Sequence, residues 1–161
     1  MARIEDIANK LNISKGTVSK ALNGAPDVSE TLRKAVLETA VELGYSRSMR
    51  KKGAKQLCLF IENMTCKEPS DFGYDIVTGF RKLAEPAGFV VCVVPLNDKI
   101  QKSISYDEYM LQNNYVGAFF LGLSLTDPWL HQMQTSHTPA VLLDNYVRGN
   151  PATCYVGVDN S

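Results

Sequence analysis

The spacing of the hydrophobic residues changes near residue 56. Up to that point apolar side chains recur three and four positions apart, as they do on one face of an α-helix. Three short helices are predicted, with apolar faces at Ile4, Ile7, Ala8 and Leu11, at Val18, Ala21 and Leu22, and at Leu32, Ala35, Val36, Ala40 and Leu43. Ser14 and Ser29 precede the second and third helices and are good N-cap residues. Asn12 and Gly44 follow the first and third helices, and both residue types accept the left-handed conformation that ends helices.

From residue 57 onward the pattern is that of alternating strands and helices. Continuous apolar runs are typical of strands that are buried on both faces, and five occur, at 57–61, 90–96, 116–121, 140–143 and 155–158. Helices are predicted between them at 75–87, where Pro86 should end the helix, at 105–113 and at 127–134. The alternation predicts a doubly wound, mostly parallel α/β sheet whose ligand crevice lies beyond the carboxyl ends of the strands.

Charge is unevenly divided along the chain, although its net charge is zero. Residues 1–55 hold eleven Lys and Arg and six Asp and Glu, whereas residues 56–161 hold six and eleven. A polyanion would be attracted to the first part and repelled by the second. If the chain binds nucleic acid, we expect residues 1–55 to do so; chance clustering of solvated charge is the alternative.

Several classes of function are disfavoured by the composition. No apolar run is long enough to span a membrane and residues 1–5 lack the layout of a secretion signal, which favours a cytoplasmic protein with no membrane partner. The four cysteines and two histidines show no metal-ligand spacing, so we expect reduced thiols, no metal and no cofactor. Ser136, His137 and Asp144 are the residue types of a catalytic triad. Because neither a nucleophile elbow nor a phosphate-binding glycine loop accompanies them, we expect no enzyme.

The first two predicted helices and their tight connection have the layout of a helix-turn-helix, whose second helix enters the major groove of DNA. If its apolar face points inward, Lys15, Gly16 and Lys20 project outward. Lysine donates to guanine O6 and N7, so Lys15 and Lys20 are the candidate base readers, whereas Gly16 presents no side chain. Short polar side chains suited to phosphate contact are those of Ser14, Thr17, Ser19 and Asn23. A three-helix bundle that contacts protein is the alternative.

A family resemblance is carried by Arg3–Ala8, Ile13–Gly24, Val28–Ser29 and Glu42–Tyr45. These segments resemble the headpiece of the lactose-repressor (LacI/GalR) family, and the likeness continues more loosely from Leu57. The resemblance implies a DNA-binding transcriptional regulator, a repressor that binds double-stranded operator DNA as a homodimer and is controlled by a small-molecule effector of sugar or nucleobase type. A helix-turn-helix regulator with a receiver-like phosphoacceptor domain is the alternative.

The resemblance also implies a domain plan and a fold class. Residues 1–45 are expected to form an all-α helix-turn-helix headpiece, and residues 46–56 a basic linker. Residues 57–161 are expected to form the N-terminal subdomain of a periplasmic-binding-protein-like, doubly wound sensor. Since the family's sensor is about twice as long, we expect a truncated or partial chain. The linker lacks the family's Pro-Asn pair and its wedging Leu, so a flexible segment whose Arg50 touches phosphate is favoured over minor-groove insertion of Met49.

Polar residues that follow the predicted strands are the candidate effector ligands, because they would face the crevice of the sensor. They are Asn63, Asn97, Ser124, Asp144, Asp159 and Asn160, with Phe72 and Tyr74 as stacking platforms for a sugar or nucleobase. For each of them, ordinary capping of a loop is the alternative.

Overall fold

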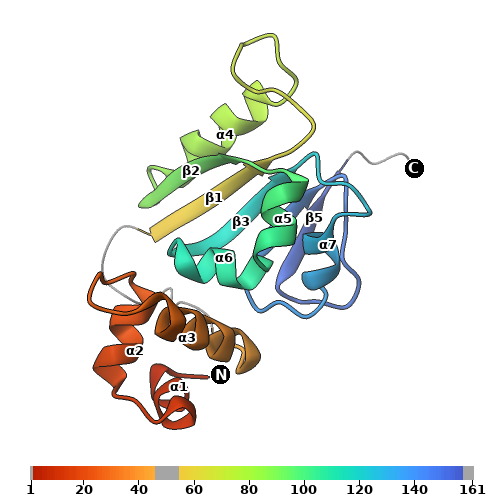
Figure 1. Cartoon of the computed structure of the whole chain (residues 1–161). Coiled ribbons are helices and arrows are strands. Elements are labelled where there is room, and N and C mark those ends of the chain that lie inside the picture. Colours follow the sequence, from red (N-terminus) through yellow and green to blue (C-terminus); the bar gives the residue numbers. More distant parts are fainter. Residues whose placement is uncertain (1, 46–54, 158–161) are drawn as a thin grey trace.

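The N-terminal part of the chain is a three-helix bundle, as the sequence predicts (Figure 1). A computed structural model describes residues 2–45 and 55–157. The bundle consists of α1 (Ile4–Leu11), α2 (Lys15–Leu22) and α3 (Glu30–Glu42). Their inward residues form one buried cluster that contains Ile7, Val18, Leu22 and Val36. We call residues 2–45 the headpiece.

The predicted start and stop residues of these helices are confirmed. Asn12 has a left-handed φ of 54°, which ends α1, and the N–H of Ile13 turns back to the carbonyl of Ala8. Ser14 and Ser29 cap α2 and α3 through their side-chain oxygens. The entry into α2 is therefore fixed by local chemistry as well as by the buried cluster.

The second part of the chain is a five-stranded sheet in which every neighbouring pair is parallel. Its strands are β1 (Lys55–Ile61), β2 (Phe89–Pro95), β3 (Tyr115–Leu121), β4 (Ala140–Leu143) and β5 (Thr153–Val156). They lie in the order β2-β1-β3-β4-β5, so the chain winds outward in both directions from β1. This is the doubly wound α/β arrangement that the alternation predicts.

Helices cover both faces of the sheet (Figure 1). On one face, α4 (Tyr74–Ala84) packs through Val77 against a cluster that contains Leu59 and Phe119. On the other face lie α5 (Asp98–Ser103), α6 (Tyr106–Gln112) and α7 (Pro128–Gln132). The core under these three helices is aromatic: Phe60 stacks on Phe120 at 4.9 Å between ring centroids, and Trp129 meets Phe60 edge-on. Leu59 and Phe60 serve opposite faces because successive side chains of a strand alternate.

Two sequence predictions about element positions are wrong, and one helix was missed. β1 begins at Lys55, so the last two residues of the predicted linker belong to the sheet. β5 lies at 153–156 rather than 155–158, because its position is set by pairing with β4 and most of its side chains are exposed. α5 was not predicted: its six residues show no clear apolar period, and its start is fixed by Asn97, whose side chain accepts from the N–H of Ile100.

The headpiece packs against the α/β part through α3 and α6 (Figure 1). Leu111 of α6 is only 4% exposed and belongs to the headpiece cluster, which also includes Leu37 of α3. α6 therefore has two buried faces, because Tyr106 and Met110 point into the aromatic core of the sheet. A further contact joins the headpiece to the loop before β4, where the His137 ring lies against Gly44.

Candidate nucleic-acid interface

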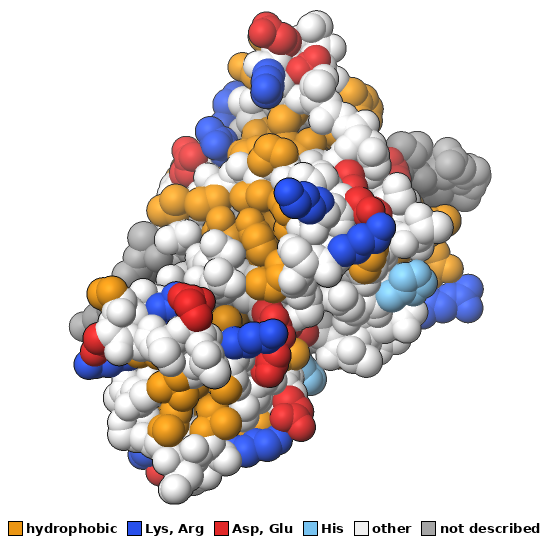
Figure 2. Space-filling view, in the orientation of Figure 1, with side chains coloured by type: hydrophobic (Ala, Val, Ile, Leu, Met, Phe, Trp, Pro, Cys, Tyr) orange, Lys and Arg blue, Asp and Glu red, His pale blue; other side chains and the backbone are white. Residues whose placement is uncertain are grey.

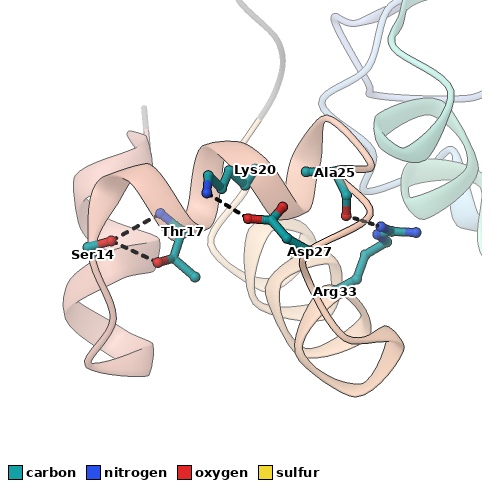
Figure 3. A network of polar contacts seen from close by, with 6 residues as sticks. All are labelled: Ser14, Thr17, Lys20, Ala25, Asp27 and Arg33. Carbon is teal, nitrogen blue, oxygen red and sulfur yellow. Dashed lines mark hydrogen bonds and ion pairs between the residues drawn. The ribbon is translucent and has the colours of Figure 1, made fainter.

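α2 is held with one face buried and the opposite face open. Its N-cap Ser14 accepts a hydrogen bond from the Thr17 N–H at 3.0 Å and shares a second, at 2.8 Å, with the Thr17 hydroxyl (Figure 3). Val18 is fully buried, and Ala21 and Leu22 are nearly so. A helix anchored in this way presents its remaining side chains to a partner without rearranging its backbone.

The predicted DNA-contacting residues of α2 lie on or beside this open face. Ser14, Lys15, Gly16, Lys20 and Asn23 are exposed, whereas Thr17 and Ser19 are half-buried. The Asn23 amide donates to the Ser19 hydroxyl at 3.4 Å, so these two side chains are already partnered. A Cβ at Gly16 would meet only the Ser14 Oγ, at ordinary contact distance, so packing does not require glycine there. Arg50 lies outside the described residues.

Both lysines of this face form ion pairs within the headpiece. Lys15 Nζ lies 2.8 Å from Glu5 Oε1 on α1. Lys20 Nζ lies 2.7 Å from Asp27 Oδ2 in the loop between α2 and α3 (Figure 3). The hydrogen bond from Lys20 lowers the pKa of the Asp27 carboxyl, which keeps that carboxylate charged. The sequence did not indicate these pairs, because their partners lie ten and seven positions away along the chain.

The headpiece as a whole is electrically neutral. Residues 2–45 contain six basic and six acidic side chains, so the positive excess of residues 1–55 falls entirely in residues 46–55. Figure 2 shows basic and acidic side chains intermingled on the visible face of the headpiece. The net positive charge that would attract a polyanion to residues 1–55 therefore lies outside the helical bundle.

A second polar region lies at the carboxyl ends of β1 and β3. Asn63, with a left-handed φ of 56°, donates to the Gly122 carbonyl at 3.2 Å and to the Ser124 hydroxyl at 3.4 Å. The structure thus brings together Asn63 and Ser124, two of the predicted effector ligands. Asn97 is occupied as the N-cap of α5, the loop-capping alternative.

The other predicted effector residues are more scattered. Asp144 follows β4 with a left-handed φ of 56°, and Phe72 is 73% exposed in the loop before α4. Tyr74 is half-buried as the first residue of α4. Asp159 and Asn160 lie outside the described residues.

Three polar residues at this edge were missed by the sequence analysis. The Gln101 amide, 2% exposed, donates to Glu62 Oε2 at 3.1 Å and accepts from the backbone N–H of Trp129 at 3.2 Å. Asp127 accepts from the Ser124 N–H at 2.6 Å. Burial and, next, the neighbouring Asp127 together raise the pKa of Glu62 to about 7. Two of the three could have been found from the sequence, because Glu62 directly follows an apolar run and Asp127 precedes Pro128. Gln101 could not, because it lies in α5, which was not predicted.

The structure separates the residues of the imagined catalytic triad. The Ser136 hydroxyl donates to Asp107 Oδ1 and accepts from the Thr138 N–H, before the start of β4. Asp144 follows the opposite end of β4. The His137 ring faces Gly44 of the headpiece. These positions do not form the hydrogen-bonded chain of nucleophile, base and acid that a triad needs.

The part of the chain that the structure describes shows neither a metal-ligand cluster nor a membrane-spanning helix. No group of three or more His, Cys, Asp or Glu gathers there in a way that could hold a metal ion. Among the helices in residues 2–45 and 55–157, none combines the length and apolar character needed to cross a membrane. The four cysteines are free thiols, of which Cys58 is buried.

Residues 3–48 match the model of the bacterial regulatory proteins of the lacI family. The headpiece is therefore similar to the proteins of this family. It is 30% identical over 140 residues to the HTH-type transcriptional regulator YkvZ of Bacillus subtilis, which covers 83% of this chain and 42% of that protein. It is 28% identical over 150 residues to the HTH-type transcriptional repressor PurR of Escherichia coli O139:H28, covering 89% and 43%.

One similar solved structure is that of the transcriptional regulator CelR in complex with cellobiose. It is 24% identical, covers 99% of this chain and 48% of that chain, and has a TM-score of 0.48. The chain spans less than half the length of these two relatives.

Proposed function

We propose that this chain regulates transcription by placing α2 in the major groove of operator DNA. The observation that carries the proposal is the open polar face of a firmly capped α2, on which Lys15 and Lys20 are 63% and 59% exposed. Lysine is suited to guanine edges and phosphates, and Ser14 and Thr17 lie at the leading end of the helix. The lacI-family match supports this reading, and the name of PurR supports repression as the mode.

The proposal includes a partner arrangement and a domain plan. Two copies would bind a palindromic site with one α2 in each of two successive major grooves. The headpiece, 2–45, binds DNA, the basic linker, 46–54, runs into β1, and the residues from Lys55 onward form the first subdomain of an effector sensor. The protein acts in the cytoplasm and is not an enzyme. The likeness to YkvZ and PurR, which extends beyond the headpiece, favours this sensor over a receiver-like domain.

A small-molecule effector would bind at the carboxyl ends of the strands, where open α/β sheets place their ligands. Asn63, Ser124 and Glu62 gather amide, hydroxyl and carboxyl groups at that edge, and such groups match the hydroxyls of a sugar or the edge of a nucleobase. Effector binding would act on the spacing of the two headpieces.

The DNA-binding part of the proposal is tested by selection from a pool of random-sequence duplexes with the full chain as bait. The enriched duplex is then titrated by fluorescence anisotropy against the wild type, Lys15→Ala and Lys20→Ala. We expect each substitution to cost about 1–3 kcal/mol of binding free energy, with relaxed preference at one base pair.

The matched control is Lys102→Ala, which removes an exposed, ion-paired lysine from α5. It should leave affinity unchanged within error. A pool that shows no enrichment would contradict the proposed function. Equal affinity of all three variants for an enriched duplex would contradict the role of Lys15 and Lys20.

A further inference from the structure

We propose that Asp27 competes with DNA for Lys20 and so limits the affinity of the headpiece for duplexes. The inference rests on the proposed function of α2. We call the exposed face of α2 that carries Lys15 and Lys20 the reading face; Asp27 lies outside it, in the loop that follows α2. The contact that carries it is the ion pair of 2.7 Å between Lys20 Nζ and Asp27 Oδ2 (Figure 3).

Asp27 is held in place by its loop. The Ala25 carbonyl accepts from the Val28 N–H at 3.2 Å. It also accepts from Arg33 Nη2 at 2.9 Å, which ties the loop to the start of α3 (Figure 3). Pro26 precedes Asp27 with a fixed φ, and Val28 after it is buried. The backbone that carries the Asp27 carboxylate is therefore pinned on both sides, which keeps the carboxylate within reach of Lys20.

A phosphate or a guanine edge must replace this carboxylate as the partner of the Lys20 ammonium. The exchange leaves the Asp27 charge without its counter-ion beside a polyanion. Both changes oppose binding, because an exposed ion pair is broken and like charges are brought together. Glu5 stands in the same relation to Lys15, at 2.8 Å. Each lysine of the reading face thus carries its own internal competitor.

The test is the affinity of full-chain Asp27→Asn for a fluorescein-labelled, mixed-sequence duplex of about three helical turns. We expect the variant to bind about three to ten times more tightly than the wild type at low salt. The plot of log affinity against log salt should steepen by about one, since Lys20 then releases a DNA counter-ion without leaving an anion behind. The gain should shrink at high salt, where exposed charges are screened.

The matched control is Glu42→Gln. Glu42 pairs with Lys10 at 2.8 Å, so this substitution also removes one exposed, ion-paired carboxylate from the headpiece. It should leave affinity nearly unchanged. An equal gain in Glu42→Gln would show that net charge alone is at work, and would overturn the inference.

A double-mutant cycle with Lys20→Ala separates competition from simple repulsion. If Asp27 acts by holding Lys20, most of the gain from Asp27→Asn disappears in the Lys20→Ala background. A gain of the same size in both backgrounds overturns the competition. A loss of affinity in Asp27→Asn that depends on the identity of one base pair also overturns it, because Asp27 would then be a base reader itself. If the wild type binds no duplex at all, it is the proposed function that fails.

Discussion

Leu111 of α6 and Leu37 of α3 are buried in one cluster, although one belongs to the α/β part and the other to the headpiece. The same α6 buries Tyr106 and Met110 against the sheet. A single short helix therefore connects the two hydrophobic cores, and a shift of α6 would displace the side chains of α3 that pack against it.

Leu111→Ala should lower the free energy of unfolding by about 2–4 kcal/mol, because it removes a buried side chain from a packed contact. Urea unfolding of the full chain, followed by far-UV circular dichroism, measures the change. The variant should also accelerate amide hydrogen exchange, relative to the wild type, more in α3 than in α4.

The control for this prediction is Leu83→Ala, which makes the same chemical change at a side chain 81% exposed. It should alter stability by less than about 0.5 kcal/mol. Equal effects of the two substitutions would show that the contact between α3 and α6 does not hold the parts together.

Ser14→Ala should destabilise the headpiece by about 0.5–2 kcal/mol, because it removes the N-cap of α2. Ser29→Ala removes the corresponding cap of α3 and should cost a similar amount. The two variants should differ in DNA affinity, measured by anisotropy well below their melting temperatures. Only Ser14→Ala should weaken binding clearly, since only that cap borders the proposed reading face. Equal losses of affinity would trace the effect to general stability.

Glu62 should make the protein less stable as the pH rises through about 7. Its pKa in the folded chain is about 7, above the ordinary 4.5, so the folded state binds more protons than the unfolded state between these values. The contribution is therefore fully present below about 4.5 and is lost as the pH rises through the folded pKa. Urea midpoints measured between pH 5 and 8.5 should show this decline.

Glu62→Gln should flatten that decline, and Asp127→Asn should shift it to lower pH, because a neighbour that raises the pKa of Glu62 is removed. Glu85→Gln, at an exposed position after α4, should leave the decline as it is. An unchanged profile in Glu62→Gln would assign the pH dependence to another group.

Gly122→Ala should destabilise the chain by more than Gly88→Ala. Both glycines have a positive φ, 80° and 90°, so both substitutions carry the backbone strain of about 1–2 kcal/mol. At Gly122 the added Cβ would also overlap the Glu62 carbonyl, whereas nothing lies within 4 Å of it at Gly88. Thermal unfolding of the two variants measures the difference. Similar losses would mean that the ends of β1 and β3 can separate at little cost.

Local patterns were enough to predict most of the fold. Ser14 and Asn12 decide helix boundaries through bonds to residues within five positions, so their roles can be read from the sequence. The sheet follows from five apolar runs. β5 was misplaced because its position depends on pairing with β4, and α5 was missed because it is short and polar.

The candidate sites were predicted less completely, for the same physical reason. The exposed face of α2 follows from helical period, but the partners of its lysines come from α1 and from a loop. Likewise Gln101, Glu62 and Asp127 meet only when α5, β1 and α7 come together at the end of the sheet. Side-chain pairings across elements have no local pattern that could reveal them.

The neutrality of residues 2–45 has a kinetic consequence for the proposed complex. Long-range attraction governs how fast a protein meets a duplex, whereas close contacts govern how long it stays. Residues 46–55 contain five basic and no acidic residues, so they would set the encounter rate, while α2 would set the dwell time. The speed of finding a site and the persistence on it could then change independently, through substitutions in two different segments.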